Sequence, residues 1–231
     1  MNAYDIVVIG SGPAGCMAAW LLAPHCKVLL VERKKLPRDK SCSGVLVRKS
    51  VEMLEARFGR IPDAVKCQPA ITRGLIVQTA SNRVYDFEDP GINIVRKHFD
   101  HWLALKARQA GAVIADETLV VELHDQGGTS GVSILRKGHR ERIEAKLVVA
   151  CDGVFGASRR LTGAPPLRRM LTLQKHFLGR CPLDPAKFYA FTSPRYSGYD
   201  AWVNTKNERV IIGTAAGTLA RARSDYDGFR A

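Results

Sequence analysis

The sequence predicts an α/β protein in which a doubly wound, Rossmann-like domain with a β-meander is joined to an incomplete, β-rich second domain. Two observations predict the first domain. An apolar run at residues 4–9, a helical stretch at 13–22 and a second apolar run at 27–32 form a strand–helix–strand unit at the N-terminus. Both apolar runs are continuous rather than alternating, as parallel strands that are buried on both faces require.

The next two elements are predicted by the residues at their ends. Ser50 begins a short helix at residues 50–58, and Gly59 follows it as a stop signal. Two strand-like runs at residues 73–88 then form a hairpin around the turn at 80–82.

A longer helix and a β-meander complete the first domain. Residues 96–110 carry apolar side chains at helical spacing and are followed by Gly111. Residues 112–150 contain several short strand runs, and the last of them, at 147–150, is fully apolar. A meander of antiparallel strands is the simplest fold for this segment.

The character of the sequence changes after Pro165 and Pro166. The remaining segment is basic, has strand-like runs at residues 188–192 and 210–212, and shows no clear helix. The predicted first domain therefore comprises residues 1–72 and 92–164, and the second comprises residues 73–91 and 165–231.

Composition limits the classes of partner. The 231 residues carry a formal net charge of +13, which favours an anionic ligand, an anionic membrane surface or nucleic acid. No nucleic-acid-binding motif is present, so nucleic acid is not expected as a partner. The six cysteines and six histidines are scattered, so no metal site is expected and the thiols are predicted to be reduced. We expect a cytoplasmic protein, and the charge is also compatible with peripheral membrane contact.

A glycine-rich turn carries the first chemical signal. Gly10-Ser-Gly12-Pro-Ala-Gly15 directly follows a predicted strand and opens a predicted helix. Gly10 permits a tight turn, Gly12 lets the backbone approach a pyrophosphate, and Gly15 lets the helix pack on the strand. Pro13 and Ala14 belong to the first helical turn, where the N–H groups and the helix dipole favour an anion. A glycine turn without a ligand is the alternative.

An acidic residue at the end of the second strand adds to this signal. Glu32 is placed to accept hydrogen bonds from the ribose hydroxyls of a dinucleotide. A carboxylate there repels a 2′-phosphate, so the site suits FAD or NAD and disfavours NADP. The basic run that starts at Arg33 has two interpretations, a solvated loop or part of the site.

Small residues follow the basic run. Ser41, Cys42 and Gly44 stand where a backbone can lie close against a flat ring or a phosphate. Cys42, the candidate catalytic residue, is interpreted either as a thiol with an elevated thiolate fraction between basic residues or as a small space-filling residue.

Four motifs together resemble the geranylgeranyl reductase family of FAD-dependent oxidoreductases, within the aromatic-ring hydroxylase-like flavoproteins. They are the glycine turn with Glu32, the segment 36–44, the Arg96-x-x-Phe99-Asp100 helix start, and the Asp152-Gly153 segment. The resemblance implies that Arg96 contacts FAD and that Asp152 lies near the pyrophosphate and ribose. The candidate cofactor-binding residues are Gly10, Gly12, Pro13, Ala14, Gly15, Glu32, Arg33, Ser41, Cys42, Gly44, Arg96, Val120, Asp152 and Gly153.

The segment 198–206 resembles the Tyr and Trp strand of the family's substrate domain. Tyr199 and Trp202 are the candidate substrate-pocket residues. The sequence departs from the family at Asn204-Thr205, where Phe-Pro is usual, and it ends at Ala231 without the family's second FAD motif. We therefore expect a front portion of such a protein.

By resemblance, the expected function is reduction of isoprenoid or similar double bonds by FAD, with NAD(P)H as a possible electron donor and a small or lipid-like substrate. Two alternatives stay open at this point: an FAD-dependent monooxygenase or halogenase, and a non-catalytic FAD-binding module.

Overall fold

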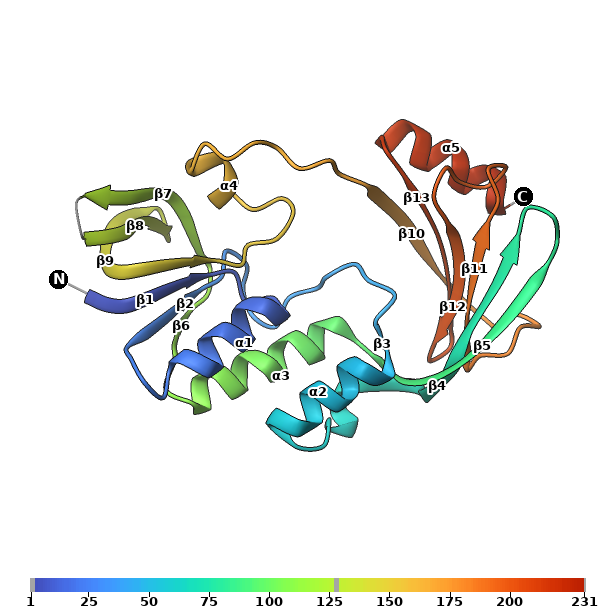
Figure 1. Ribbon diagram of the computed structural model, residues 1–231, viewed down its shortest axis with the longest axis horizontal. Coiled ribbons are helices and arrows are strands. Elements are labelled where there is room, and N and C mark those ends of the chain that lie inside the picture. Colours follow the sequence, from blue (N-terminus) through green and yellow to red (C-terminus); the bar gives the residue numbers. More distant parts are fainter. Residues whose placement is uncertain (1–2, 127–128, 231) are drawn as a thin grey trace. The chain divides into compact units, whose positions relative to one another are not determined.

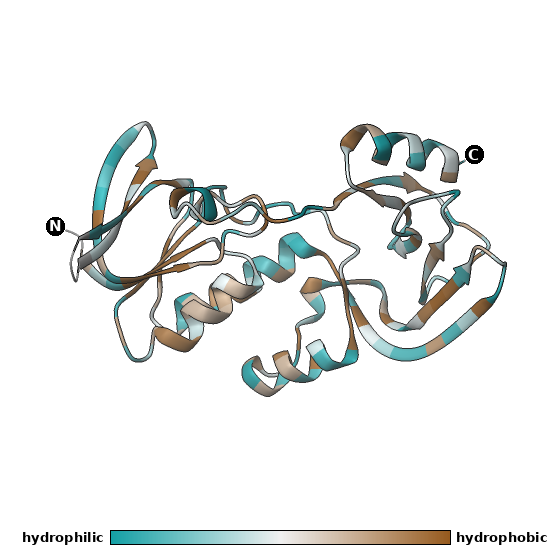
Figure 2. Ribbon diagram, turned by 45° about the horizontal axis from the view of Figure 1, so that its top comes forward, coloured by the Kyte–Doolittle hydropathy of each residue, from teal (hydrophilic) through white to brown (hydrophobic). Residues whose placement is uncertain are grey.

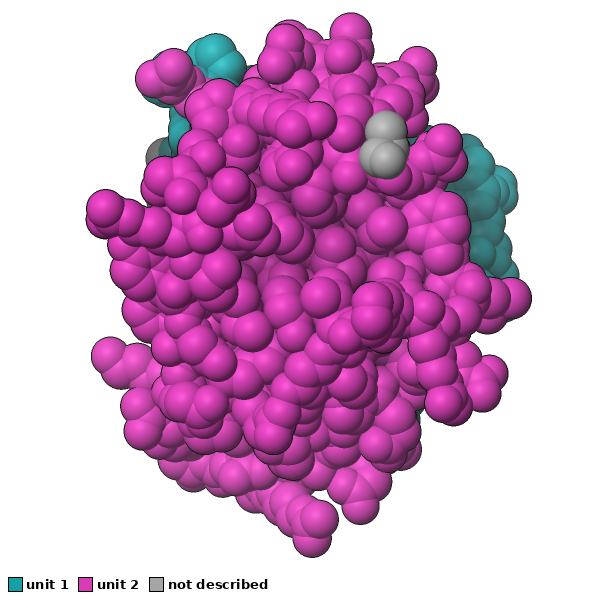
Figure 3. All heavy atoms as spheres, turned by 90° about the vertical axis from the view of Figure 1, so that its right-hand side faces the viewer, with its two compact units in different colours: residues 1–40, 97–167 teal, residues 41–96, 168–231 magenta. Residues whose placement is uncertain are grey.

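The computed structural model describes residues 3–126 and 129–230 (Figure 1). The chain divides into two compact units. Unit 1 comprises residues 1–40 and 97–167, and unit 2 comprises residues 41–96 and 168–231, which are coloured differently in Figure 3.

Unit 1 is built on a six-stranded sheet with the order β6-β2-β1-β9-β8-β7. The central strand β1 pairs in parallel with both β2 and β9, and β2 pairs in parallel with β6. Helix α1 connects β1 to β2, and helix α3 precedes β6, as in a doubly wound fold. The bounds are β1 (Ala3–Ile9), α1 (Pro13–Leu22), β2 (Val28–Val31), α3 (Arg96–Gln109) and β6 (Val113–Ala115).

The predicted β-meander closes this unit. Strands β7 (Thr118–Gln126), β8 (Thr129–Arg136) and β9 (His139–Ala150) pair antiparallel in sequence order, and a short helix α4 (Ser158–Leu161) follows. Apolar side chains from the meander pack with those of β1 and β2 in one core, and hydrophobic colouring follows these strands in Figure 2. The core residues include Val7, Ile9, Leu29, Val31, Val120, Val132, Ile134 and Ile143.

Unit 2 contains a seven-stranded sheet with the order β10-β13-β12-β11-β4-β5-β3. All its pairings are antiparallel except that of β11 with β4. The predicted hairpin is present, and its strands extend beyond residues 73–88. The bounds are β3 (Val45–Leu46), α2 (Arg48–Phe58), a 3-10 turn η1 (Asp63–Val65), β4 (Lys66–Thr79), β5 (Val84–Ile94), β10 (Leu171–Leu178), β11 (Lys187–Thr192), β12 (Ala201–Lys206), β13 (Arg209–Ala216) and α5 (Leu219–Arg230).

Helix α5 corrects the expectation of no clear helix after residue 165. Its sequence is largely polar and contains Gly228, so its hydrophobic periodicity is weak (Figure 2). Packing stabilises it instead, because Ala222 and Tyr226 are fully buried. An ion pair between Arg221 and Asp225, one turn apart at 2.7 Å, adds to this.

Two further expectations differ from the structure. Helix α2 begins at Arg48 with Val47 as its N-cap, so Ser50 does not cap it, although Gly59, with a φ of +74°, ends it as predicted. The division into units also differs from the predicted domains, because residues 41–72 group with unit 2. The reason is that β3 and the first half of β4 pair with β5.

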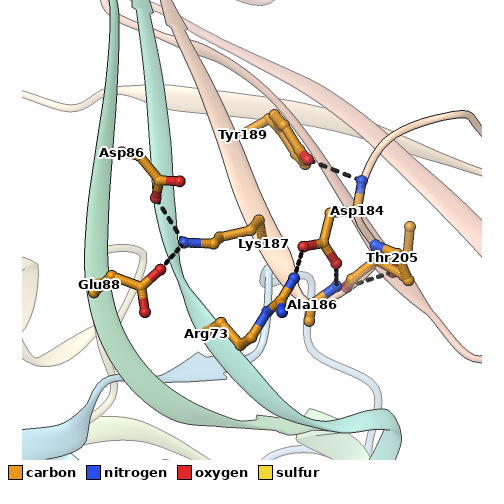
Figure 4. Close-up of polar contacts among 9 residues, drawn as sticks. Arg73, Asp86, Glu88, Asp184, Ala186, Lys187, Tyr189 and Thr205 are labelled. Atoms are coloured by element: carbon orange, nitrogen blue, oxygen red, sulfur yellow. Dashed lines mark hydrogen bonds and ion pairs between the residues drawn. The ribbon is translucent and has the colours of Figure 1, made fainter.

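A charge network crosses the sheet of unit 2 (Figure 4). Lys187 on β11 is paired with Gly74 on β4, which is paired with Glu88 on β5. Because Gly74 has no side chain, the lysine reaches over β4 and places Nζ 2.6 Å from Asp86 Oδ1 and 2.7 Å from Glu88 Oε1. Beside it, Arg73 is paired with Asp184.

Candidate functional site

The glycine turn between β1 and α1 has the close approaches that its sequence predicts. Gly10 has a φ of +97°, and a Cβ there would lie 2.6 Å from the carbonyl oxygen of Cys151. A Cβ on Gly15 would overlap the carbonyl oxygen of Gly10. Gly12 differs, because the nearest atom to its Cβ position is Arg38 Nη2 at 3.8 Å. The turn is therefore tightly packed at both ends and open at its middle glycine.

The first turn of α1 faces this opening. Gly12 is the N-cap in an extended conformation without a side-chain cap, and Pro13 and Ala14 are exposed. The first N–H groups of a helix have no partner within the helix, and its dipole is positive at this end. The first turn contains no acidic residue. A phosphate group fits this arrangement.

Glu32 lies next to the turn and is 5% exposed. Its Oε2 accepts hydrogen bonds from the backbone N–H and hydroxyl of Ser11, at 3.2 and 2.8 Å, and its Oε1 accepts one from the N–H of Lys34 at 2.9 Å. Burial alone would raise the pKa of Glu32, but these hydrogen bonds and the charge of Arg38 outweigh it and hold the pKa below its ordinary value. Among the described residues Oε1 accepts from one donor only, so it retains the capacity to accept a further hydrogen bond.

Arg38 is a site residue that is missing from the predicted cofactor-binding residues, although it lies in the segment 36–44 that resembles the family. Its Nε lies 3.0 Å from Glu32 Oε2, and its Nη1 lies 3.2 Å from Oδ2 of Asp100, which is 1% exposed. The guanidinium thus joins two buried carboxylates and brings positive charge beside Gly12. The Arg38 and Asp100 positions in the family-like motifs were the available signal.

Asp152 and Gly153 follow β9 at the same end of the sheet. Asp152 accepts hydrogen bonds from the N–H and the hydroxyl of Ser158, at 2.9 and 2.6 Å, so its carboxylate holds the start of α4. Gly153 is exposed with a φ of +78°. The backbone at residues 151–152 crosses directly over Gly10, which places this segment against the glycine turn.

For two candidates in unit 1, Val120 and Arg33, the structure shows no side-chain hydrogen bond or ion pair with the glycine turn among the described residues. The side chain of Val120 is 5% exposed and belongs to the core, so any contact with a cofactor there would be made by its backbone. The pairing of β7 with β8 shifts register between Val120 and Glu122. Arg33 is exposed beside Glu32.

The remaining cofactor candidates form a second group, in unit 2. Gly44 has a φ of +67°, and its N–H donates to Cys42 Sγ at 3.4 Å. Cys42 is exposed, and partial desolvation of its thiol opposes ionisation, but this N–H, a hydrogen bond from Arg96 and the charges of Arg96 and Lys206 lower the pKa of the thiol. The lowered pKa agrees with one of the two interpretations of Cys42, a thiol with an elevated thiolate fraction, and both interpretations stay predictions. Ser41 is exposed beside it.

The two substrate-pocket candidates have different environments. Tyr199 is 53% exposed, whereas Trp202 is 7% exposed. The indole of Trp202 lies over Gly213, where any side chain would overlap the ring.

Residues 3–179 match a protein family described as "FAD binding domain". The chain belongs to this FAD-binding family. The match confirms FAD as the cofactor and agrees with the open glycine, the free helix N-terminus and the acidic residue of unit 1.

Relatives support the resemblance seen in the motifs. The chain is 31% identical over 220 residues to digeranylgeranylglycerophospholipid reductase 1 of Methanopyrus kandleri, covering 91% of this chain and 57% of the relative. The structure of a geranylgeranyl bacteriochlorophyll reductase-like protein from Thermoplasma acidophilum superposes with a TM-score of 0.85 at 20% identity, covering 99% of this chain and 62% of that one. The chain thus spans less than two thirds of the length of either protein.

A third similarity concerns the fold alone. The myxobacterial chondrochloren halogenase, which is FAD-dependent, superposes with a TM-score of 0.78 at 19% identity, covering 99% of this chain and 56% of that one. The predicted Rossmann-like fold with a β-rich second part is therefore confirmed. Among the helices of the described residues, none is long and apolar enough to span a bilayer.

Proposed function

We propose that this chain is the FAD-binding part of an oxidoreductase that reduces carbon–carbon double bonds of an isoprenoid, lipid-like substrate. The observation that carries the proposal is the glycine turn, open at Gly12, with buried Glu32 beside it. The substrate class is taken from the Methanopyrus relative, whose name states a reductase of a geranylgeranyl lipid. FAD, when bound, supplies the hydride chemistry.

The residues of unit 1 hold the cofactor in this proposal. The N–H groups of the first turn of α1 bind the pyrophosphate, and Gly12 permits its close approach. Glu32 Oε1 accepts a hydrogen bond from the ribose, and Arg38 keeps that carboxylate ionised and in place. A second phosphate on the ribose would meet the Glu32 carboxylate, so NADP is excluded from this site and NAD(P)H would act only as an external electron donor.

Reoxidation of the reduced flavin tests the activity. The FAD-loaded protein is reduced anaerobically, and its absorbance near the flavin maximum is followed after addition of a geranylgeranyl lipid or of oxygen. We expect oxidation by the lipid with loss of one double bond, detected by mass spectrometry. Rapid oxygen uptake that depends on substrate would instead support the monooxygenase or halogenase alternative. Oxidation by neither would leave the non-catalytic FAD-binding module.

We also propose that the protein works in the cytoplasm at the surface of a membrane. The formal net charge of +13 supports this, because anionic lipid headgroups attract basic surfaces. Co-sedimentation with vesicles tests the proposal. Binding to vesicles with phosphatidylserine that disappears at high salt supports it, and equal binding to neutral vesicles contradicts it.

A further inference from the structure

The strand β12 presents three polar or amphipathic side chains on one face of the unit 2 sheet. Trp202, Asn204 and Lys206 alternate with Val203 and Thr205, so they point to the same side. We call this side the Trp202 face. The opposite side is covered by α5, because Thr214, which pairs with Ala201, donates its hydroxyl to the carbonyl of Ala222 at 3.2 Å.

A cation–π contact supports this assignment of faces. Lys175 pairs with Ile212, which in turn pairs with Val203, so all three share the side opposite Trp202. The Lys175 ammonium lies 4.7 Å from the ring centre of Tyr226 on α5. Helix α5 therefore packs against the Val203 side.

Buried polar atoms on the Trp202 face lack partners. Asn204 is 3% exposed, and within the described part of the chain neither its Oδ1 nor its Nδ2 has a hydrogen-bond partner. Nε1 of Trp202 is likewise buried and unpartnered there. Leaving such groups unpaired is unfavourable, because their hydrogen bonds to water are lost and not replaced.

The sheet neighbours of these two residues cannot supply the missing hydrogen bonds from their side chains. Asn204 is paired with Ile211, and Trp202 is paired with Ala190 and Gly213. Lys206, the next residue on the face, already directs its ammonium to the carbonyl oxygen of Ile94. Within the described part of the chain, three buried atoms on this face therefore lack a partner: the indole nitrogen of Trp202 and the amide nitrogen and oxygen of Asn204.

We propose that Asn204 and Trp202 bind the hydroxyl group of the substrate, so that the molecule taken at this face is an isoprenoid alcohol rather than a plain hydrocarbon. This rests on the proposed function and specifies its substrate class. A hydroxyl has two acceptor lone pairs and one donor. It accepts from Trp202 Nε1 and Asn204 Nδ2 and donates to Asn204 Oδ1, which gives each of these three atoms a partner. A carbonyl oxygen would leave Oδ1 unpaired, and a hydrocarbon would leave all three unpaired.

A matched pair of small probes tests the proposal on the purified chain without added FAD. Geraniol and 2,6-dimethylocta-2,6-diene differ only in the hydroxyl group. Binding is followed by the ¹H–¹⁵N signal of the Trp202 indole, assigned with Trp202→Phe. We expect geraniol to move this signal and to bind about tenfold more tightly than the diene, which corresponds to a net gain from hydrogen bonds of about 1.4 kcal/mol.

Two variants locate the preference. Asn204→Leu should bind both probes with similar affinity, whereas Thr205→Val, on the opposite side of β12, should keep the preference for geraniol. Any one of three results would overturn the proposal: equal affinities of the wild type for the two probes, an unmoved indole signal, or a preference for geraniol that survives in Asn204→Leu. Equal affinities are expected if ordered water already binds the three unpartnered atoms. The wild-type comparison decides the matter even if Asn204→Leu does not fold. A chain that prefers geraniol yet fails to bind FAD would contradict the proposed function and leave this inference intact.

Discussion

The guanidinium of Arg38 donates from Nε to Oε2 of Glu32 across 3.0 Å, with both side chains largely buried beside the glycine turn. The same guanidinium also pairs with Asp100 on α3. One cation therefore serves two buried carboxylates that come from different parts of the sequence. Each carboxylate would carry a large desolvation cost without it.

Removal of this cation should destabilise unit 1. In Arg38→Met, Glu32 and Asp100 remain buried without their partner, and we expect a loss of about 3–5 kcal/mol in the free energy of unfolding, as for other broken buried ion pairs. Denaturant unfolding followed by circular dichroism measures it. Arg38→Lys keeps the charge but not the fork that spans both carboxylates, so its loss should be smaller. Wild-type stability in Arg38→Met would show that the pair contributes little.

Acid should weaken the same unit through Glu32. Because the folded-state pKa of Glu32 lies below its ordinary value of 4.5, its contribution to stability is complete above that value. It is lost as pH falls through the lower, folded-state pKa. Thermal unfolding between pH 7 and pH 3 should therefore show a steeper acid loss in the wild type than in Glu32→Gln. Identical slopes would mean that the Glu32 pKa is not lowered on folding.

Substitutions of two glycines of the turn should have different effects, one on folding stability and the other on FAD affinity. Gly15→Ala places a Cβ against the carbonyl of Gly10, so we expect a destabilisation of about 1–3 kcal/mol. Gly12→Ala meets nothing closer than 3.8 Å and should fold normally, yet it should weaken FAD binding because the methyl group occupies the approach of the pyrophosphate. Unfolding curves and FAD titrations of both variants are the measurements. Full FAD affinity in Gly12→Ala would place the pyrophosphate elsewhere.

Lys187, which pairs with Asp86 and Glu88 across the sheet, should stabilise unit 2. Lys187→Met leaves Asp86 and Glu88 without their shared cation, so we expect a lower melting temperature than for the exposed control Lys49→Met. The hydrogen bonds to Asp86 and Glu88 raise the pKa of Lys187 above 10.5. Its contribution is therefore complete below that value and is lost as pH rises through the higher, folded-state pKa. A melting temperature for Lys187→Met equal to that of the control would contradict this role.

The parts of the fold that depend on local patterns were predictable from the sequence. The strand, glycine turn and helix at residues 4–22 occur as expected, because apolar runs and glycine spacing determine them within a short segment. Helix α5 was missed because its stability comes from the packing of Tyr226 and Ala222 on the unit 2 sheet, and the weak hydrophobic periodicity of its sequence does not show that packing. The second unit also begins earlier than expected, since long-range strand pairing assigns residues 41–72 to it.

The candidate site shows the same limit. The roles of three residues could be predicted because the dinucleotide-binding motif defines a structural position for each of them: Gly10, Gly12 and Glu32. The role of Arg38 could not be predicted, because a run of basic residues gives no indication of which side chain points inward and pairs with Asp100. The unpartnered amide of Asn204 is also invisible in the sequence, where it is only a departure from a family pattern.

Direct titration with FAD tests the central claim, that unit 1 binds this cofactor with Glu32 on the ribose. Flavin fluorescence and visible absorbance are recorded for the wild type, for Glu32→Gln and for the exposed control Glu117→Gln. We predict saturable binding by the wild type and the control, and an affinity roughly 10-fold lower for Glu32→Gln, as loss of a hydrogen bond to a charged group implies. A wild-type chain that stays colourless and does not change the fluorescence of added FAD would contradict the claim, and equal affinities in all three proteins would contradict the role of Glu32.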